Sequence, residues 1–379
     1  MIFAIFSTAV AILFSYIVLQ RYAENASKLD KGDNNKLNIL APGIVPVNNE
    51  FRWENQKPFP YKPFKKGSYK MTLAIRKLDP NDMFCIEDTY LDRVNLRKKI
   101  FQNEKLYGFH ESAIESLKEA YTYIFLFLMR RYPMYFVLSA DSTTIDNKIT
   151  GESFPLDPTN LKPNQIMYNI VSNIEEDILI LIKNPETSEM DEYVLRAAIS
   201  LFPAGFNPLE KMNNPLTKIH EPVPGYVNKL QLSMNKFFSR LNTHEYIVRN
   251  NWSIQTHCNL CAPSGSHATE EEATVIHPFY PEELDYNKVF FRVEKQCFTR
   301  LAKTGSNLMV IRTYVTSLME LRDSLNDEEK ETLCSAIDGL TGELAIYKRR
   351  IQWGDAAKAF IRGESNGINT TAKKYLFVS

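Results

Sequence analysis

The chain has 379 residues, with 45 Lys and Arg against 45 Asp and Glu, so its formal net charge is zero. This balance does not indicate the basic surface that nucleic-acid binding needs, and we expect no nucleic-acid partner. Hydrophobic residues make up 44% of the chain, enough to bury a substantial core. The five cysteines, an odd number, do not fit a disulfide framework.

The first residues predict a membrane anchor. Residues 2–19 carry no charge, and as a helix they would span about 27 Å, against roughly 30 Å for a bilayer core. A cleaved signal peptide is the alternative. However, no basic residue precedes Arg21, and the nearest cleavage sites place Arg21 or Glu24 where a small residue is needed. We therefore predict one uncleaved transmembrane helix over 1–21.

Flanking charges predict the orientation of this anchor. Four basic residues follow the span, whereas only the terminal amine precedes it: Arg21, Lys28, Lys31 and Lys36. The positive-inside rule then predicts a single-pass membrane protein with its body in the cytoplasm. Glycosylation sequons at Asn25, Asn251 and Asn369 indicate the opposite side, although such triplets also arise by chance in an Asn-rich chain.

Composition divides the remainder into a linker, one body and a tail. Residues 22–66 are first charged and Asn-rich and then Pro-rich, which is typical of a tether. We predict one folded domain over 67–355 and a C-terminal tail over 356–379.

The body mixes helical and strand patterns along the chain. Asp88 is placed to cap a helix that runs to Ile100, and apolar residues at helical spacing predict a long helix over 111–131. Strands are predicted over 134–140, 177–182 and 193–202, with a turn at 184–187. A helix over 227–241, strands over 289–298 and 308–316 joined by a turn at 305–307, and a closing helix over 327–346 complete the body. Hairpins between helices favour an α+β fold with a largely antiparallel sheet.

Common catalytic and nucleotide-binding signatures are absent from the sequence, including glycine-rich phosphate loops, Gly-x-Ser-x-Gly and His-Glu-x-x-His. Cys258 and Cys261 form a Cys-x-x-Cys pair, and His267 and His277 downstream could complete four zinc ligands. The spacing matches no closed zinc pattern. Two thiols in a surface loop is therefore the favoured interpretation, and metal or redox use is the alternative.

His220 precedes the stiff segment Pro222-Val223-Pro224. A histidine on such a segment has a fixed direction, which a metal or haem ligand requires. A packed or surface loop histidine is the commoner explanation of this pattern taken alone. A strand begins near Arg292. On it, Glu294, Gln296 and Phe298 would point to one face of the sheet, and Lys295 would point to the other. That polar face predicts either a pocket lining or a solvated sheet surface.

Seven segments in this order resemble the haem-dependent oxidative N-demethylase alpha-subunit family, whose fungal relatives are called HRQ family proteins. They cover residues 71–79, 90–97, 201–203, 218–226, 249–254, 291–296 and 311–314. The His-x-Pro-Val-Pro and Val-Glu-Lys-Gln segments are the most specific of them. Lys295 departs from the family, which more often has Arg there, and Leu301-Ala302-Lys303 replaces a more usual Leu-Pro.

The resemblance implies a PAS-like antiparallel sheet, non-covalently bound haem b and oxygen-dependent demethylation of a small secondary amine, with release of formaldehyde. It implies that His220 ligates the iron while its second ring nitrogen donates to a carbonyl or carboxylate. It further implies cofactor-binding roles for Trp252 and Gln296, and catalytic roles for Glu294 and Arg312 in one pocket. Because the sequence has no flavin or iron–sulfur signature, electrons would come from a separate flavin-type reductase. The alternatives are a non-catalytic haem sensor or carrier and a PAS-like interaction module.

Overall fold

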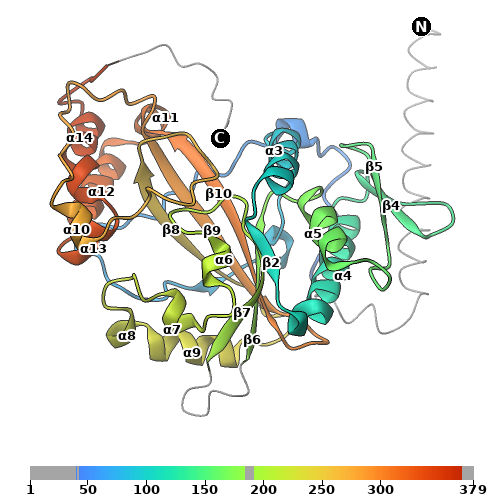
Figure 1. The fold of residues 1–379 in the computed structure, drawn as a ribbon. Coiled ribbons are helices and arrows are strands. Elements are labelled where there is room, and N and C mark those ends of the chain that lie inside the picture. Colours follow the sequence, from blue (N-terminus) through green and yellow to red (C-terminus); the bar gives the residue numbers. More distant parts are fainter. Residues whose placement is uncertain (1–39, 41, 184–191, 369–379) are drawn as a thin grey trace, which may run out of the picture.

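The structure is a computed structural model that describes residue 40, residues 42–183 and residues 192–368. These residues form two antiparallel sheets, with helices packed around the larger one (Figure 1). The predicted anchor over 1–21 and the predicted turn at 184–187 lie outside the described residues. Within the described ranges, no helix has both the length and the apolar character needed to cross a bilayer.

The larger sheet has seven strands in the order β1-β8-β9-β10-β6-β7-β2. In chain order these are β1 (Arg76–Lys77), β2 (Tyr107–Phe109), β6 (Asp177–Lys183), β7 (Tyr193–Ile199), β8 (Ile247–Gln255), β9 (Phe290–Arg300) and β10 (Asn307–Ser317). Every neighbouring pair is antiparallel, which confirms the predicted sheet type. The smaller sheet contains β3 (Phe136–Leu138), β4 (Thr144–Asn147) and β5 (Glu152–Pro155).

The strands β9 and β10 form a hairpin at the centre of the larger sheet. Its register pairs Asn307 with Arg300 at the turn and Ser317 with Phe290 at the far end. Gly305 in the turn has a φ of +68°, which glycine adopts without steric cost. Because alternate residues of a strand point to opposite faces, this register also decides which side chains of the two strands can meet.

One face of the sheet, called here the α4 face, packs on α3 (Tyr90–Asn103), α4 (Ile114–Arg131) and α5 (Pro163–Val171). The strands contribute alternating apolar residues such as Val248, Cys297 and Val310. The helix α4 contributes a stripe at spacings of three and four residues: Leu117, Tyr121, Ile124 and Leu128. The apolar residues of the strands and those of α4 therefore pack against each other in one core.

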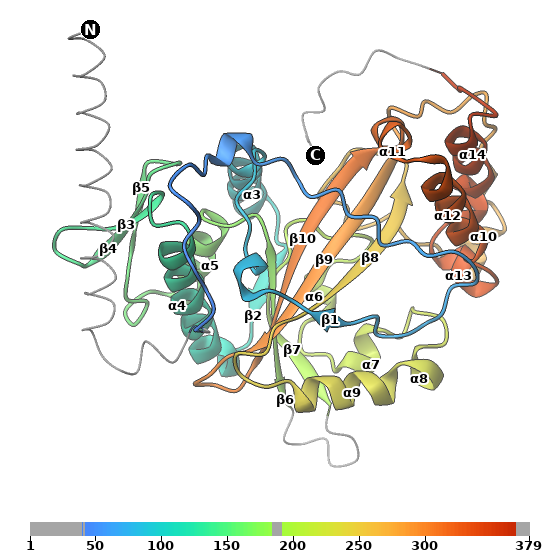
Figure 2. The ribbon, with the colours of Figure 1, turned by 180° about the vertical axis from the view of Figure 1, so that it is seen from behind.

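The opposite face, called here the α9 face, is covered at one end by α7 (Leu216–Ile219), α8 (Tyr226–Lys229) and α9 (Gln231–Arg240). Ile247 and Phe298, paired across β8 and β9, are buried there with Met234 and Phe238. The short helix α6 (Pro208–Lys211) precedes this group. Figures 1 and 2, which view the molecule from opposite sides, both show α7, α8 and α9 together near β6 and β7.

The C-terminal helices form a second helical block, far from α4 and α5 in both views (Figures 1 and 2). They are α10 (Glu270–Ala273), α11 (Leu318–Ser324), α12 (Asp327–Asp338), α13 (Glu343–Tyr347) and α14 (Arg350–Arg362). Phe360 and Ile361 of α14 are buried in the cluster that also holds Trp252 and Val293. The folded body therefore continues past the predicted boundary at residue 355.

Part of the predicted linker also packs on the body. Ile44 is 1% exposed, and the ring of Phe64 lies edge-on to that of Phe291 at 6.0 Å. Between them lies the first of three 3-10 turns, Trp53–Asn55; the others are Pro80–Asp82 and Glu111–Ala113. The Pro-rich segment is thus extended, as its prolines predict, but it lies against the core.

Several predicted elements differ in detail. The helix predicted over 227–241 is broken at Leu230 into α8 and α9, and the one predicted over 327–346 is interrupted before Gly342. Asp88 does not cap α3; it forms an ion pair with Lys57 at 2.7 Å. The strand β8 was not predicted, because the run Arg249-Asn250-Asn251 hides its apolar alternation.

Candidate functional site

Polar side chains gather on the α9 face where β8 and β9 run side by side. Arg249 faces Gln296 across the two strands, and Asn251 faces Glu294. Gln296 Nε2 donates to Glu294 Oε2 at 3.1 Å, and Asn251 Nδ2 donates to the same oxygen at 3.4 Å. We call these four residues the Glu294 cluster. The structure therefore brings together Glu294 and Gln296, as the strand alternation predicts.

His220 directly follows α7 and stacks on Tyr226, with ring centroids 4.7 Å apart and planes 8° apart. Its Nδ1 lies 2.8 Å from the carbonyl oxygen of Leu216. Because a carbonyl only accepts hydrogen bonds, Nδ1 carries the proton and Nε2 carries the lone pair. Among the described residues, Nε2 has no hydrogen-bond partner. The carbonyl contact expected for a ligating histidine is thus present.

Electrostatics around His220 favour the neutral ring. Burial lowers the pKa of His220, and the nearby guanidinium of Arg249 lowers this pKa further. Neutral imidazole is the form that ligates metals. The α7 segment and β8 thus present a neutral imidazole and a cation on the same side of the sheet.

Arg249 has no carboxylate within ion-pair distance among the described residues, and Glu294 acts on its charge only from farther away. The Arg249 side chain is half-buried, and its Nε has no hydrogen-bond partner in the described part of the chain. Burial lowers the pKa of its guanidinium, which reflects the cost of a charge that is poorly hydrated. An anion bound beside Arg249 would remove that cost.

Apolar side chains surround this corner of the molecule. Eight partly buried ones pack on the buried core under the α9 face: Met71, Leu73, Leu179, Met212, Ile219, Val223, Phe237 and Met309. A haem needs an axial nitrogen, a partner for its propionate carboxylates and an apolar wall for its ring. His220 offers such a nitrogen, Arg249 offers such a cation and these side chains offer apolar surface, so the types of residue on this side of the sheet fit haem.

Two further titratable groups, Lys348 and His267, lie near the Glu294 cluster. Lys348 Nζ donates to the carbonyl of Trp252 at 2.7 Å and to Asn251 Oδ1 at 3.2 Å, and burial lowers the pKa of Lys348 to about 8. His267 stacks on Tyr347 at 4.2 Å, and burial lowers the pKa of His267 to about 4. Sequence reasoning missed Lys348, and it considered His267 only as a zinc ligand beside the Cys-x-x-Cys pair. Only the tertiary packing of α13 and the 257–269 loop brings them to β8.

Residue 205 must be glycine, because the His267 ring lies directly against it. Gly205 has a φ of +75°, and a Cβ on it would lie 2.2 Å from His267 Nδ1. A side chain at residue 205 would therefore displace the imidazole.

Trp252 lies on the α4 face, away from the Glu294 cluster. Its side chain is 8% exposed and packs on Phe291 with ring centroids 5.7 Å apart. Strand alternation explains this, because Trp252 follows Asn251 by one residue. The structure does not bring the indole ring of Trp252 to the side of the sheet that carries His220 and Gln296.

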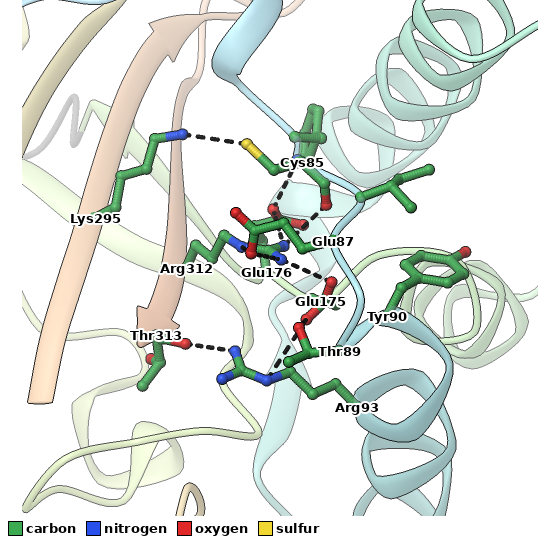
Figure 3. Close-up of polar contacts among 12 residues, drawn as sticks. Cys85, Glu87, Thr89, Tyr90, Arg93, Glu175, Glu176, Lys295, Arg312 and Thr313 are labelled. Carbon is green, nitrogen blue, oxygen red and sulfur yellow. Dashed lines mark hydrogen bonds and ion pairs between the residues drawn. The ribbon is translucent and has the colours of Figure 1, made fainter. Parts of the chain in front are cut away.

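Arg312 also lies on the α4 face, in a network of buried charges (Figure 3). Its Nε and Nη2 both donate to Glu87, at 3.1 and 2.5 Å. Nη2 also donates to Glu175 at 2.7 Å, while Nη1 donates to Glu176 and to the carbonyl of Cys85, both at 2.9 Å. These contacts use all five N–H donors of the guanidinium. Arg312 and Glu294 therefore do not share one pocket: they point to opposite faces of the sheet.

A model of the family "Haem-dependent oxidative N-demethylase, alpha subunit-like" matches residues 74–358 of the chain. The chain belongs to this family. The matched range includes His220, Trp252, Glu294, Gln296 and Arg312. Comparison with curated proteins gave no match. Membership makes this protein N-demethylase-like, and the family's name indicates dependence on haem.

The Cys-x-x-Cys loop of this N-demethylase-like protein shows no metal arrangement. Cys258 and Cys261 are free and half-buried. Within the ranges that the structure describes, no group of three or more His, Cys, Asp and Glu residues is arranged to hold a metal ion. His267 is occupied by its stack on Tyr347.

Proposed function

We propose that this protein binds haem b non-covalently through His220 and removes a methyl group from a small secondary amine in an oxygen-dependent oxidation that releases formaldehyde. The observation that carries the proposal is the state of His220. Its Nδ1 is bound to the Leu216 carbonyl, and its Nε2 is without a partner in the described chain, on the same side of the sheet as the unpaired Arg249. Family membership supports the same chemistry.

Haem, when bound, supplies the oxygen activation and the one-electron chemistry. His220 would hold the iron through Nε2, and the Leu216 carbonyl would fix the tautomer and raise the basicity of the ring. Arg249 would pair with a propionate carboxylate, which would offset the cost of its half-buried charge.

Glu294 would handle the proton of the substrate. A secondary amine is a cation at neutral pH, and the 13% exposed side chain of Glu294 supplies a nearby carboxylate. Gln296 and Asn251 donate to its Oε2, and the buried Arg292 lies 3.6 Å from its Oε1 in an ion pair, so these three residues hold the carboxylate in place. The substrate cation would have to share Oε1 with Arg292. Accepting the ammonium proton would free the nitrogen lone pair before oxidation begins.

Electrons would come from a separate flavin-type reductase. The predicted anchor over 1–21 would hold the body at the cytoplasmic side of a membrane, where such a reductase could reach it. Both parts of this proposal rest on the sequence alone.

Formaldehyde release tests the turnover. Haem-loaded protein is given oxygen, an artificial reductant and a panel of N-methyl secondary amines. We expect formaldehyde from at least one amine, and a loss of about a hundredfold in Glu294→Gln because the proton acceptor is removed. Glu221→Gln, which changes an exposed carboxylate beside His220, is the matched control and should keep full activity. Haem-loaded wild-type protein that releases no formaldehyde from any amine would contradict turnover and favour a haem sensor or carrier.

A further inference from the structure

Lys295 is a buried lysine without a carboxylate partner. It is 2% exposed on the α4 face of β9, in register with Arg312 on β10. Among the described residues no carboxylate lies within ion-pair distance of it, because the three glutamates nearby all bind Arg312. Its Nζ instead donates to the carbonyl of Asp82 and lies 3.5 Å from the Sγ of Cys85 (Figure 3).

The backbone of Cys85 is held on both sides, so its thiol has a fixed position. Its N–H donates to Glu176 at 3.2 Å, and its carbonyl accepts from Arg312 at 2.9 Å. The buried charge network thus places the sulfur against the ammonium group of Lys295. Cys85 is also half-buried rather than fully enclosed, so a small oxidant can reach it.

We propose that Cys85 and Lys295 form a modification site, in which oxidation links Sγ and Nζ through one bridging oxygen atom. The proposal rests on the 3.5 Å contact, on the fixed backbone of Cys85 and on the lack of a carboxylate partner for Lys295 among the described residues. It does not depend on haem or on the proposed demethylation.

Hydrogen peroxide is the oxidant that we assign. A first peroxide oxidises the thiol to a sulfenic acid and is reduced to water. The lysine ammonium then loses a proton. A second peroxide takes two electrons and two protons from the sulfenic O–H and the amine N–H, which joins oxygen to nitrogen. In total, one thiol, one ammonium and two hydrogen peroxide molecules give the S–O–N link, three waters and one proton.

The resting pair is a neutral thiol beside an ammonium. Burial raises the pKa of the Cys85 thiol, and Lys295 opposes that effect. The ammonium thereby stabilises the thiolate that attacks the peroxide. Cys297 is buried on the same face, and burial and the nearby Cys85 raise the pKa of its thiol, so Cys297 would be the competing partner, by a disulfide.

Mass spectrometry of the full chain after mild peroxide treatment tests the cross-link. We expect a linked pair of peptides containing Cys85 and Lys295, heavier by one oxygen and lighter by two hydrogens than the two free peptides, and separated again by dithiothreitol. Lys295→Arg keeps the charge but removes the primary amine and should abolish the pair, as should Cys85→Ser. Cys258→Ser, which removes another half-buried thiol, is the control and should leave it intact.

Three results would overturn the proposal: Cys85 recovered as an unmodified thiol, Cys85 disulfide-bonded to Cys297, or Cys85 oxidised without any link to Lys295. Thermal unfolding gives a second readout, since either single variant can fold poorly. The oxidised wild-type protein should unfold at a higher temperature than the reduced protein, and dithiothreitol should remove that gain. An unchanged unfolding temperature, together with unlinked peptides, would contradict the link.

Discussion

The surroundings of Arg312 show that its side chain is a structural group. It is 1% exposed, and three glutamates and one carbonyl accept all of its hydrogens. Tyr314 donates to the second oxygen of Glu87, which holds the network in place from the same strand. A guanidinium bound in this way has no donor left for a developing charge on a substrate.

Replacing Arg312 by Ala should therefore destabilise the fold strongly, by about 3–5 kcal/mol, since Glu87 and Glu176 would lose their cation and Glu175 would keep only Arg93. Equilibrium unfolding in urea measures this change. Arg350→Ala breaks an exposed ion pair with Asp338 and should cost about 1 kcal/mol or less. Equal losses in the two variants would contradict a structural role for Arg312.

Sequence reasoning at the residue scale succeeds where a local pattern decides. Alternation along β9 is enough to place Glu294 and Gln296 on one face. It could not place Arg312, because the carboxylates that hold it come from Glu87, Glu175 and Glu176, far away in the chain. Arg249 lies inside a segment that resembles the family, but only the structure shows that its charge is unpaired.

At the scale of elements, the four-residue helix α7 is what aims His220. Thr217 in this helix donates its N–H to Glu192 at 2.8 Å and its hydroxyl to the same carboxylate oxygen. Its hydroxyl also accepts from Gln231 of α9 at 2.7 Å. Such a short helix gains little stability from its own hydrogen bonds, so these contacts hold it in position.

Thr217→Val should weaken haem binding about tenfold while His220 still ligates the iron, because the helix that positions the ligand is loosened. Haemin titration followed by absorption measures the affinity and, from the band position, the ligand. Thr122→Val removes a similar hydroxyl contact on α4, at 3.0 Å, and should not change the affinity. A shifted band in Thr217→Val would show instead that the ligand itself is lost.

Element prediction worked best for long periodic segments. The helix α4 and the hairpin of β9 and β10 follow from apolar spacing alone. The strand β8 was not predicted because Arg249, Asn250 and Asn251 interrupt its apolar pattern. Arg249 and Asn251 belong to the Glu294 cluster, so the interruption coincides with the candidate site. Local patterns thus fail where function or long-range pairing overrides them.

For the whole molecule, hairpin spacing was sufficient to predict an antiparallel α+β fold, but not its strand order. The order β1-β8-β9-β10-β6-β7-β2 depends on pairings between distant segments, such as β10 with β6. The extent of the body also depends on packing: Ile44 and Phe64 before it and Phe360 after it are buried. Composition alone assigned these ends to a linker and a tail.

Haem ligation by His220 is the central claim, and an absorption spectrum tests it most directly. Purified protein titrated with haemin should develop a Soret band that saturates at one haem per chain. His220→Ala should lose or shift this band, because the axial nitrogen is removed. His110→Ala, which changes an exposed histidine outside the candidate site, should leave the band unchanged. A His220→Ala protein with the same band and affinity as the wild type would contradict the account.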